Sequence, residues 1–505
     1  MSSSWLSLYS AEEANSQGSE KPFGNLVSRK QAFRLMEGGH RFDLVVFGCG
    51  LSGIAVAREA ALEGAQVLVI EPGYPGDHAC AWRECILRDL SRAPWSLVRG
   101  GATLRKAVTS LAPHLARARG CDLSVFRGLG ARLVLRSLRS IASDLPESDG
   151  LGCIPDVDER LLIRELTLAA RQEGVIVMSA TTPGFVERDV ESATFRVAVR
   201  DLLSEEQVVI RGGGLFVDPT FSQPLASRIG TPITKIVPLS RPHVVVVCSV
   251  AGDDQVGRAR LLKLPGGRVG TLCQLQPGIV EVCLLDVEAR ADEETLSNLA
   301  RFICEGAGYT VEGEISCRRV GAVYGASVTI ENRRGILLPH EAAPWNVLRV
   351  ITKTLAYVES DGGSRRVRRP LPGEWRGSER ESFIQSAWGA GVSESVITDV
   401  LTRWQGRVRY IPDMERGFEE VCPGVLRGEI ALAVASDQVT SLEDLVFGSL
   451  ALSRKPGWRE LVKPLAEALG ETGAVDAHGL DVEPLLASMS LSFPPSGAHR
   501  RGKFC

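Results

Sequence analysis

The chain has 505 residues, a length that predicts about three domains or two large ones. Its 58 basic and 61 acidic side chains leave a formal net charge of −3, which excludes an electrostatic nucleic-acid binder because such proteins carry a basic excess. With 44% hydrophobic and 24% charged residues, the composition is that of an average globular protein. Disordered, collagen-like and coiled-coil chains are excluded as well.

Twelve cysteines are present, but none are spaced as C-x-x-C, so the sequence predicts no zinc site, no redox motif and no bound metal. The first 22 residues lack a basic start followed by an apolar stretch, so we expect no signal peptide and a cytoplasmic protein with reduced thiols. No apolar run approaches the roughly 18 residues of a spanning helix. Any contact with the inner face of a membrane would therefore be peripheral, and composition leaves a homodimer open.

The amino-terminal half predicts an α/β fold. Residues 1–27 are polar and predict a flexible arm, Ser28–Glu37 has helical spacing, and Phe42–Phe47 predicts a buried strand. Helices and strands then alternate to about Asp218, which is typical of a sheet with crossover helices. We expect a nucleotide-binding domain with inserted helices over residues 28–237.

The rest of the chain predicts two further units. Residues 238–360 are rich in strands, at His243–Val250, Gly267–Leu275 and Ile279–Leu285, and predict an antiparallel-sheet substrate domain that returns to the first domain. An Arg- and Gly-rich linker is expected over 361–381, a helical domain over 382–475 and a tail over 476–505. Helical spacing in the last domain covers three segments: Val392–Trp404, Glu429–Val434 and Leu442–Leu452.

A glycine-rich turn follows the first buried strand, as Gly48-Cys49-Gly50-Leu51-Ser52-Gly53. A helical segment follows it, and the next strand ends in Glu71, 21 residues after Gly50. This context, rather than the G-x-G-x-x-G pattern alone, predicts a Rossmann-type dinucleotide site. The alternative is an ordinary strand, glycine turn and helix.

Each residue of the turn has an expected role in that site. Gly48 permits the tight turn, Gly50 lets the backbone approach a pyrophosphate, and Gly53 allows close packing of helix on strand. The amides of Leu51, Ser52 and Gly53 are expected to face the phosphates. Glu71 is expected to accept hydrogen bonds from the adenosine ribose, which disfavours NADP. The motif does not say which other dinucleotide binds.

Five further segments, in order, resemble the FAD-dependent glycerol-3-phosphate dehydrogenase family from about Ser28 to Leu452. They are Trp95–Val98 through Leu111-Ala112-Pro113-His114-Leu115, Asp158-Glu159-Arg160-Leu161 through Gly174, Arg241-Pro242-His243-Val244-Val245-Val246, Pro423–Ile430, and Thr440-Ser441-Leu442-Glu443-Asp444. The resemblance implies FAD in the amino-terminal domain, beneath a substrate domain. It also implies oxidation of sn-glycerol 3-phosphate to dihydroxyacetone phosphate, with electrons passing to a quinone-type acceptor.

Several family motifs are altered in this chain. The family's K-L-I-H-G-G-L-R-Y stretch is shortened to Cys85-Ile86-Leu87-Arg88-Asp89, where Arg88 corresponds to the family's arginine. Its N-A-T-G becomes Val217-Asp218-Pro219-Thr220, and its G-T-T-D becomes Cys283-Leu284-Leu285-Asp286. Its substrate arginine falls near Val323. We expect the chain to be a divergent member whose adenosine end is retained and whose substrate chemistry is reduced.

The resemblance implies three catalytic candidates. His243 would be the base, and Arg88 would hold the substrate phosphate, a dianion that requires cationic partners. Lys353 would hold the same phosphate or lie beside the flavin. A strand histidine satisfied by its neighbours and a solvated helix lysine are the bland alternatives. Three functions stay open: an oxidoreductase of glycerol 3-phosphate or a related phosphorylated alcohol, a flavin-binding non-catalytic partner or regulatory protein, and an oxidoreductase of a different small substrate.

Overall fold

The computed structural model describes the backbone of most of the chain between Phe23 and Leu486. The described residues are 23, 26–76, 79, 82, 85–87, 101–108, 114–122, 129–142, 153–189, 194–218, 243–251, 259–263, 269–276, 278–285, 293–320, 329–333, 336–340, 347–357, 371–452, 457–475, 477–483 and 485–486. Most of the predicted arm and much of the predicted tail lie outside them, as do Arg88 and Val323.

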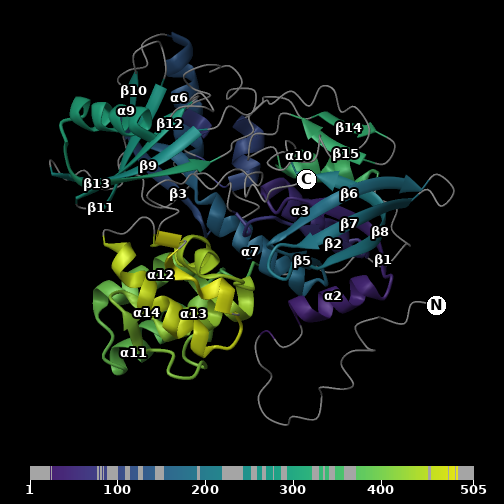
Figure 1. The fold of residues 1–505 in the computed structure, drawn as a ribbon. Coiled ribbons are helices and arrows are strands. Elements are labelled where there is room, and N and C mark those ends of the chain that lie inside the picture. The colour runs from purple at the N-terminus through teal and green to yellow at the C-terminus, as the bar shows by residue number, and fades with distance from the viewer. Residues whose placement is uncertain are drawn as a thin grey trace.

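A mixed sheet forms the amino-terminal body, at the right of Figure 1, in the order β14-β15-β8-β1-β2-β5, with β7 and β6 following antiparallel from β8. Its strands are β1 (Arg41–Phe47), β2 (Val67–Ile70), β5 (Ile176–Met178), β6 (Thr181–Asp189), β7 (Thr194–Asp201), β8 (Gln207–Val217), β14 (Thr329–Arg333) and β15 (Ile336–His340). Strand β1 runs parallel to both β2 and β8, so the carboxyl ends of these three strands meet at one edge. Dinucleotide sites of open α/β sheets lie at such an edge.

Four helices accompany this sheet: α2 (Arg29–Glu37), α3 (Leu51–Leu62), α7 (Glu159–Gln172) and α10 (Val347–Leu355). Helix α2 begins where the Ser28 hydroxyl accepts a hydrogen bond from the amide of Gln31 and the Ser28 amide donates one to the Gln31 side chain, which forms a capping box at the start of the predicted helix. Helix α3 is buried on nearly all sides because α7 and α10 both pack against it. It therefore lies inside the body, with its amino terminus directed at the sheet edge.

The second sheet contains seven strands of the described chain, in the order β13-β9-β12-β11-β10-β3-β4. They are β3 (Ala116–Asp122), β4 (Cys153–Val157), β9 (His243–Ala251), β10 (Ala259–Lys263), β11 (Val269–Gln276), β12 (Ile279–Leu285) and β13 (Thr310–Val320). The predicted antiparallel pairing of the three central strands is confirmed by the registers of β9 with β12 and of β11 with β12. Helix α9 (Glu293–Gly306) packs on β9, β12 and β13, and α6 (Leu129–Ala142) packs on β4.

Strands β3 and β4 differ from the sequence prediction. They lie within residues 28–237, which were assigned to the nucleotide-binding domain, yet they hydrogen-bond in the second sheet. The chain thus leaves the first sheet after β2, contributes to the second sheet, and returns through α7 to β5. Strands β14 and β15 belong to the first sheet, where β15 runs parallel to β8.

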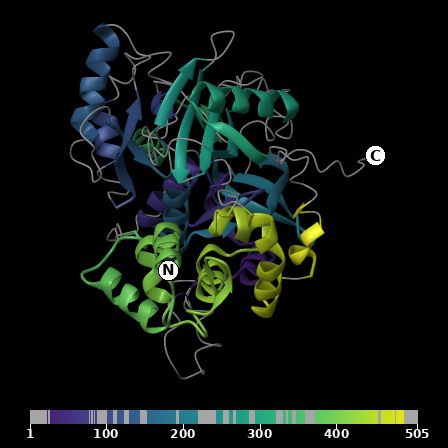
Figure 2. The same ribbon diagram turned by 90° about the vertical axis from the view of Figure 1, so that its left-hand side faces the viewer.

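The carboxyl-terminal body is helical, with its own buried core, and lies below the second sheet in Figures 1 and 2. Its elements are α11 (Glu379–Gly389), α12 (Glu394–Trp404), the 3-10 helix η3 (Gln405–Tyr410), β16 (Glu420–Cys422), β17 (Val425–Leu426), α13 (Arg427–Leu432), the π-helical turns η4 (Ala433–Asp437) and η5 (Asp444–Ser449), α14 (Trp458–Glu471) and the 3-10 helix η7 (Ala477–Leu480). The fully buried Glu429 carboxylate accepts hydrogen bonds from Arg403 and Trp404, each at 2.7 Å.

Part of the predicted linker is packed rather than exposed. Leu371 is buried in the core of the first body, and Arg409 donates to the carbonyls of Pro372 and Glu374 at 2.8 and 3.1 Å. The amide of Gly406 donates to the carbonyl of Gly373 at 2.9 Å. The backbone of residues 372–374, within the predicted linker, is therefore hydrogen-bonded to the carboxyl-terminal body.

Candidate functional site

The glycine turn joins the end of β1 to the start of α3. Gly48 has a φ of 97°, a left-handed conformation that strains any residue with a Cβ. Its amide donates to the carbonyl of Ile70 at 2.8 Å, which ties the turn to the end of β2. The left-handed backbone and this hydrogen bond therefore account for the tight turn predicted at Gly48.

Gly50 and Gly53 lie where other atoms approach the backbone closely. A Cβ on Gly53 would lie 2.2 Å from the carbonyl oxygen of Gly48, so the helix can start this close to the strand only with glycine there. A Cβ on Gly50 would lie 2.6 Å from Oδ1 of Asp218. Gly50 caps α3 without a side-chain hydrogen bond, while Leu51 is buried and Ser52 is half-buried at the start of the helix.

Glu71 follows β2 and faces the same turn. It is only 4% exposed; its Oε2 accepts a hydrogen bond of 2.6 Å from the amide of Cys49, and its Oε1 accepts one of 2.9 Å from the amide of Gly73. Both of its carboxylate oxygens are thus tied to the backbone beside the turn. Its adenosine-binding role stays a prediction.

Asp218 was not predicted as a site residue, and it changes the expected surroundings of the turn. It follows β8, is 1% exposed, and its Oδ2 accepts a hydrogen bond of 2.6 Å from the amide of Gly53. The Gly53 amide was expected to face a phosphate, and it faces this carboxylate instead. The sequence signal was present in the altered N-A-T-G motif, where an acid stands at Asp218.

The pKa of the Cys49 thiol is affected by the two carboxylates near the turn. Burial raises its pKa well above the usual range, and the nearby carboxylates of Glu71 and Asp218 raise it further, against a smaller lowering by a hydrogen bond with Thr167. The Cys49 sulfur lies 3.6 Å from the Thr167 hydroxyl on α7. Cys49 is therefore a protonated thiol in the core rather than a nucleophile.

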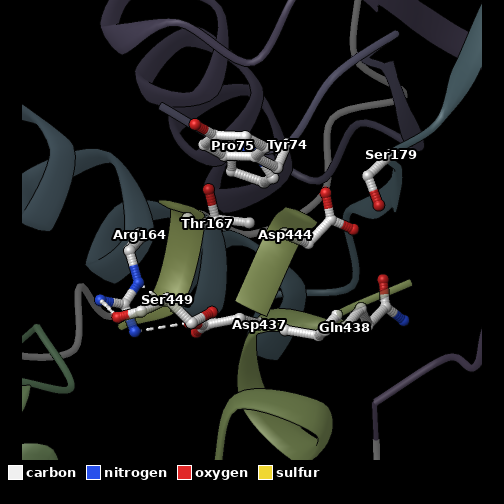
Figure 3. Close-up of a pocket in the computed structure, with 11 residues that line it drawn as sticks. Tyr74, Pro75, Arg164, Thr167, Ser179, Asp437, Gln438, Asp444 and Ser449 are labelled. Carbon is white, nitrogen blue, oxygen red and sulfur yellow. Dashed lines mark hydrogen bonds and ion pairs between the residues drawn. The ribbon is translucent and has the colours of Figure 1, made fainter. Parts of the chain in front are cut away.

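A small pocket, lined in part by Thr167, lies between the amino-terminal body and the carboxyl-terminal body (Figure 3). Arg164 on α7 donates to Asp437 through Nε at 2.9 Å and Nη2 at 2.5 Å, and through Nη1 to the carbonyl of Ser449 at 2.8 Å. Tyr74, which follows Glu71 by three residues, lines the same pocket. The segment after Glu71 is thus held between the two bodies.

The predicted catalytic residues stay predictions. His243 begins β9 and is paired in register with Val320 of β13, but its side chain lies outside what the structure describes. Lys353 is exposed on α10, the helix that packs on α3, and Arg88 lies outside the described residues. His114, of the Ala-Pro-His match, lies with Nε2 2.8 Å from Oε2 of Glu165 on α7, which agrees with a structural role.

Neither a membrane-spanning helix nor a group of metal ligands is found in the described part of the chain. None of the helices in it is long and apolar enough to span a membrane. In the same residues, His, Cys, Asp and Glu side chains form no group of three or more that could hold a metal ion.

The chain is similar to known glycerol-3-phosphate dehydrogenases. No family model matches it. A glycerol-3-phosphate dehydrogenase of Synechocystis sp. is 26% identical in an alignment of length 253. The match covers 41% of this chain and 45% of the relative, so the chain spans about half the length of the curated relative that it matches. The crystal structure of the glycerol-3-phosphate dehydrogenase of Bacillus halodurans, complexed with FAD, superposes with a TM-score of 0.60 at 13% identity, covering 92% of this chain and 98% of that one. The fold predicted from the sequence and the resemblance on which it rested are confirmed.

Proposed function

We propose that this chain is a divergent member of the FAD-dependent glycerol-3-phosphate dehydrogenase family, and that it binds FAD as an oxidoreductase of a small phosphorylated alcohol. One observation carries the proposal: the turn of Gly48, Gly50 and Gly53 lies at the carboxyl ends of the parallel strands β1, β2 and β8, with Glu71 hydrogen-bonded to it. The superposition with the FAD-complexed structure over nearly the whole chain supports the cofactor assignment.

The residues of the turn define how FAD would be held. Glu71 would accept from the ribose of the adenosine, and the amides at the start of α3 would meet the pyrophosphate. The glycine cradle and Glu71 fit the cofactor. The Asp218 carboxylate does not fit the cofactor, because it adds a negative charge beside the position of the two negative charges of the pyrophosphate.

The catalytic part of the proposal rests on the family resemblance. Bound FAD would supply the acceptor for a hydride from C2 of glycerol 3-phosphate, and a quinone-type acceptor would take the electrons onward. His243 would take the proton of the C2 hydroxyl, while Lys353 and Arg88 would neutralise the phosphate. The same proposal includes peripheral contact of the protein with a membrane surface and its assembly as a homodimer.

One structural observation favours a reduced or different substrate chemistry. Cys283 and Leu284, which replace the family's glycine and threonine, are 1% and 0% exposed in β12. Buried apolar side chains pack the second sheet and offer no hydrogen bond to a substrate. The alternative is therefore a flavin-binding relative that acts as a partner or regulatory protein, or an oxidoreductase of another small substrate.

Anaerobic mixing of the FAD-saturated protein with glycerol 3-phosphate tests the catalytic part of the proposal. We expect slow loss of the flavin absorption band, with weak saturation, because several of the family's polar groups are absent. A band that stays unchanged at high glycerol 3-phosphate, in protein that holds FAD, would contradict the substrate assignment and support the non-catalytic relative. Glycerol without phosphate is the matched control.

A further inference from the structure

The Asp218 carboxylate lies against the two glycine positions that a pyrophosphate would approach. Its Oδ2 accepts from the Gly53 amide at 2.6 Å, and its Oδ1 is the atom that a Cβ on Gly50 would meet at 2.6 Å. A carboxylate at the start of a helix makes the interactions that a phosphate oxygen would make there. Asp218 thus offers this helix an anion from within the chain.

The backbone holds Asp218 in this place. The neighbouring Val217 is paired in register with Phe47, and the amide of Asp218 donates to the carbonyl of Phe47 at 2.8 Å. The side chain is 1% exposed, so a carboxylate there is largely shielded from water. Poor shielding by solvent strengthens repulsion between like charges.

A second carboxylate is hydrogen-bonded to the same turn. Glu71 approaches the turn from β2 through the Cys49 amide, while Asp218 approaches from β8 through the Gly53 amide. A pyrophosphate would bring two more negative charges to this turn. The arrangement already satisfies the helix start and resists the charge of the cofactor.

Resting on the proposed function, we propose that Asp218 is a built-in anion that competes with the FAD pyrophosphate for the start of α3. It stabilises the flavin-free protein and lowers the affinity for FAD, so binding of FAD requires the carboxylate to move away from Gly53. The altered N-A-T-G motif then sets the strength of cofactor binding rather than abolishing the site.

A purely structural capping role makes the opposite prediction for the cofactor. If Asp218 only held the turn in its binding shape, removing its charge would lower both the stability and the affinity for FAD. If Asp218 competes with the cofactor, removing its charge lowers the stability of the flavin-free protein and raises the affinity. The two measurements therefore separate these roles.

The experiment measures the dissociation constant for FAD by flavin fluorescence, with urea unfolding of the flavin-free protein, in the parent, Asp218→Asn and Asp218→Ser. The serine variant serves if asparagine fails to fold. Asp43→Asn is the matched control, because its Oδ2 accepts a backbone hydrogen bond of 2.7 Å from Gln66 at the opposite edge of the same sheet. We expect Asp218→Asn to bind FAD about tenfold more tightly or better, and to unfold at lower urea, while Asp43→Asn leaves the affinity unchanged.

Equal or weaker FAD binding by both Asp218 variants, in folded protein, would overturn the inference and leave the proposed function standing. Failure of the parent and of every variant to bind FAD at saturating concentration would overturn the proposed function, and this inference with it. Tighter binding by Asp43→Asn as well would show a general effect of charge and would also overturn the role of Asp218.

Discussion

Glu71 and Cys49 are joined by a hydrogen bond of 2.6 Å, from the Cys49 amide to Oε2 of the Glu71 carboxylate. The bond links the end of β2 to the turn that follows β1, and it is buried. Because β1 and β2 are parallel neighbours, this one contact fixes the acid relative to the glycine turn. The acid and the turn therefore form a single structural unit, which we propose holds the adenosine.

Substitution Glu71→Gln should weaken both this unit and FAD binding. The amide side chain replaces a charge-assisted hydrogen bond with a neutral one, so we expect a loss of about 1–2 kcal/mol in the free energy of unfolding and about tenfold in FAD affinity. Urea unfolding and an FAD titration measure the two effects. Glu206→Gln, at an exposed position, is the control. Unchanged FAD affinity in Glu71→Gln would remove Glu71 from the site.

Gly50 should tolerate a side chain only when Asp218 is shortened. Gly50→Ala would push a Cβ into the Asp218 carboxylate, so we expect it to cost about 1–3 kcal/mol when made in the parent and much less when made in the Asp218→Ala variant. Gly53→Ala meets the backbone carbonyl of Gly48 instead, and no shortening of Asp218 should rescue it. Urea unfolding of all the variants completes the comparison. Additive losses at positions 50 and 218 would contradict the close approach.

The larger Gly50→Val should abolish retention of FAD, since its side chain would occupy space that the pyrophosphate needs. The flavin absorption of the purified variant is the measurement, with circular dichroism to show that it folds. A folded Gly50→Val protein as yellow as the parent would show that flavin binds elsewhere.

Asp437 should make the contact between the two bodies sensitive to acid. Burial by itself raises the pKa of its carboxyl, but the Arg164 and Arg407 guanidiniums outweigh burial and hold that pKa below its usual range. The lowered pKa means that Asp437 contributes stability at neutral pH, which is lost as the pH falls below about 4.

Asp437→Asn should therefore cost about 3–5 kcal/mol at pH 7, because two buried guanidiniums lose their charged partner. The difference from the parent should shrink as the pH falls toward 3. Urea unfolding at pH 7, 5 and 3 measures it. Asp399→Asn is the control, since that carboxylate is 40% exposed and lies 4.0 Å from Arg403. A difference that does not depend on pH would contradict the role of the Asp437 charge.

Lys353 and His243 should affect different kinetic constants if the catalytic proposal holds. Lys353→Ala removes a cation for the substrate phosphate and should mainly weaken glycerol 3-phosphate binding, while His243→Ala removes the base and should mainly slow flavin reduction. Stopped-flow reduction over a range of substrate concentrations separates the two. Rapid, tight reduction that neither substitution disturbs would place the active site elsewhere.

The fold was largely predictable because its signals are local. The glycine turn, the helix started by Ser28 and the strand Ile279–Leu285 each follow from residues close together in the sequence. The placement of β3 and β4 in the second sheet was not predictable, since it depends on pairing with β10, more than a hundred residues away. The same holds at the site, where Glu71 follows a known spacing but Asp218 meets Gly53 only through the pairing of β1 with β8.

A titration of the parent protein with FAD, followed by competition with ADP, tests whether the glycine turn and Glu71 form a dinucleotide site. ADP carries the adenosine and pyrophosphate that the turn and Glu71 would hold, so it should displace FAD from a site at this turn. The account predicts one FAD bound per chain and its release as ADP rises. No binding at saturating FAD, or FAD that ADP does not displace, would contradict the assignment of a dinucleotide site to Gly48, Gly50, Gly53 and Glu71.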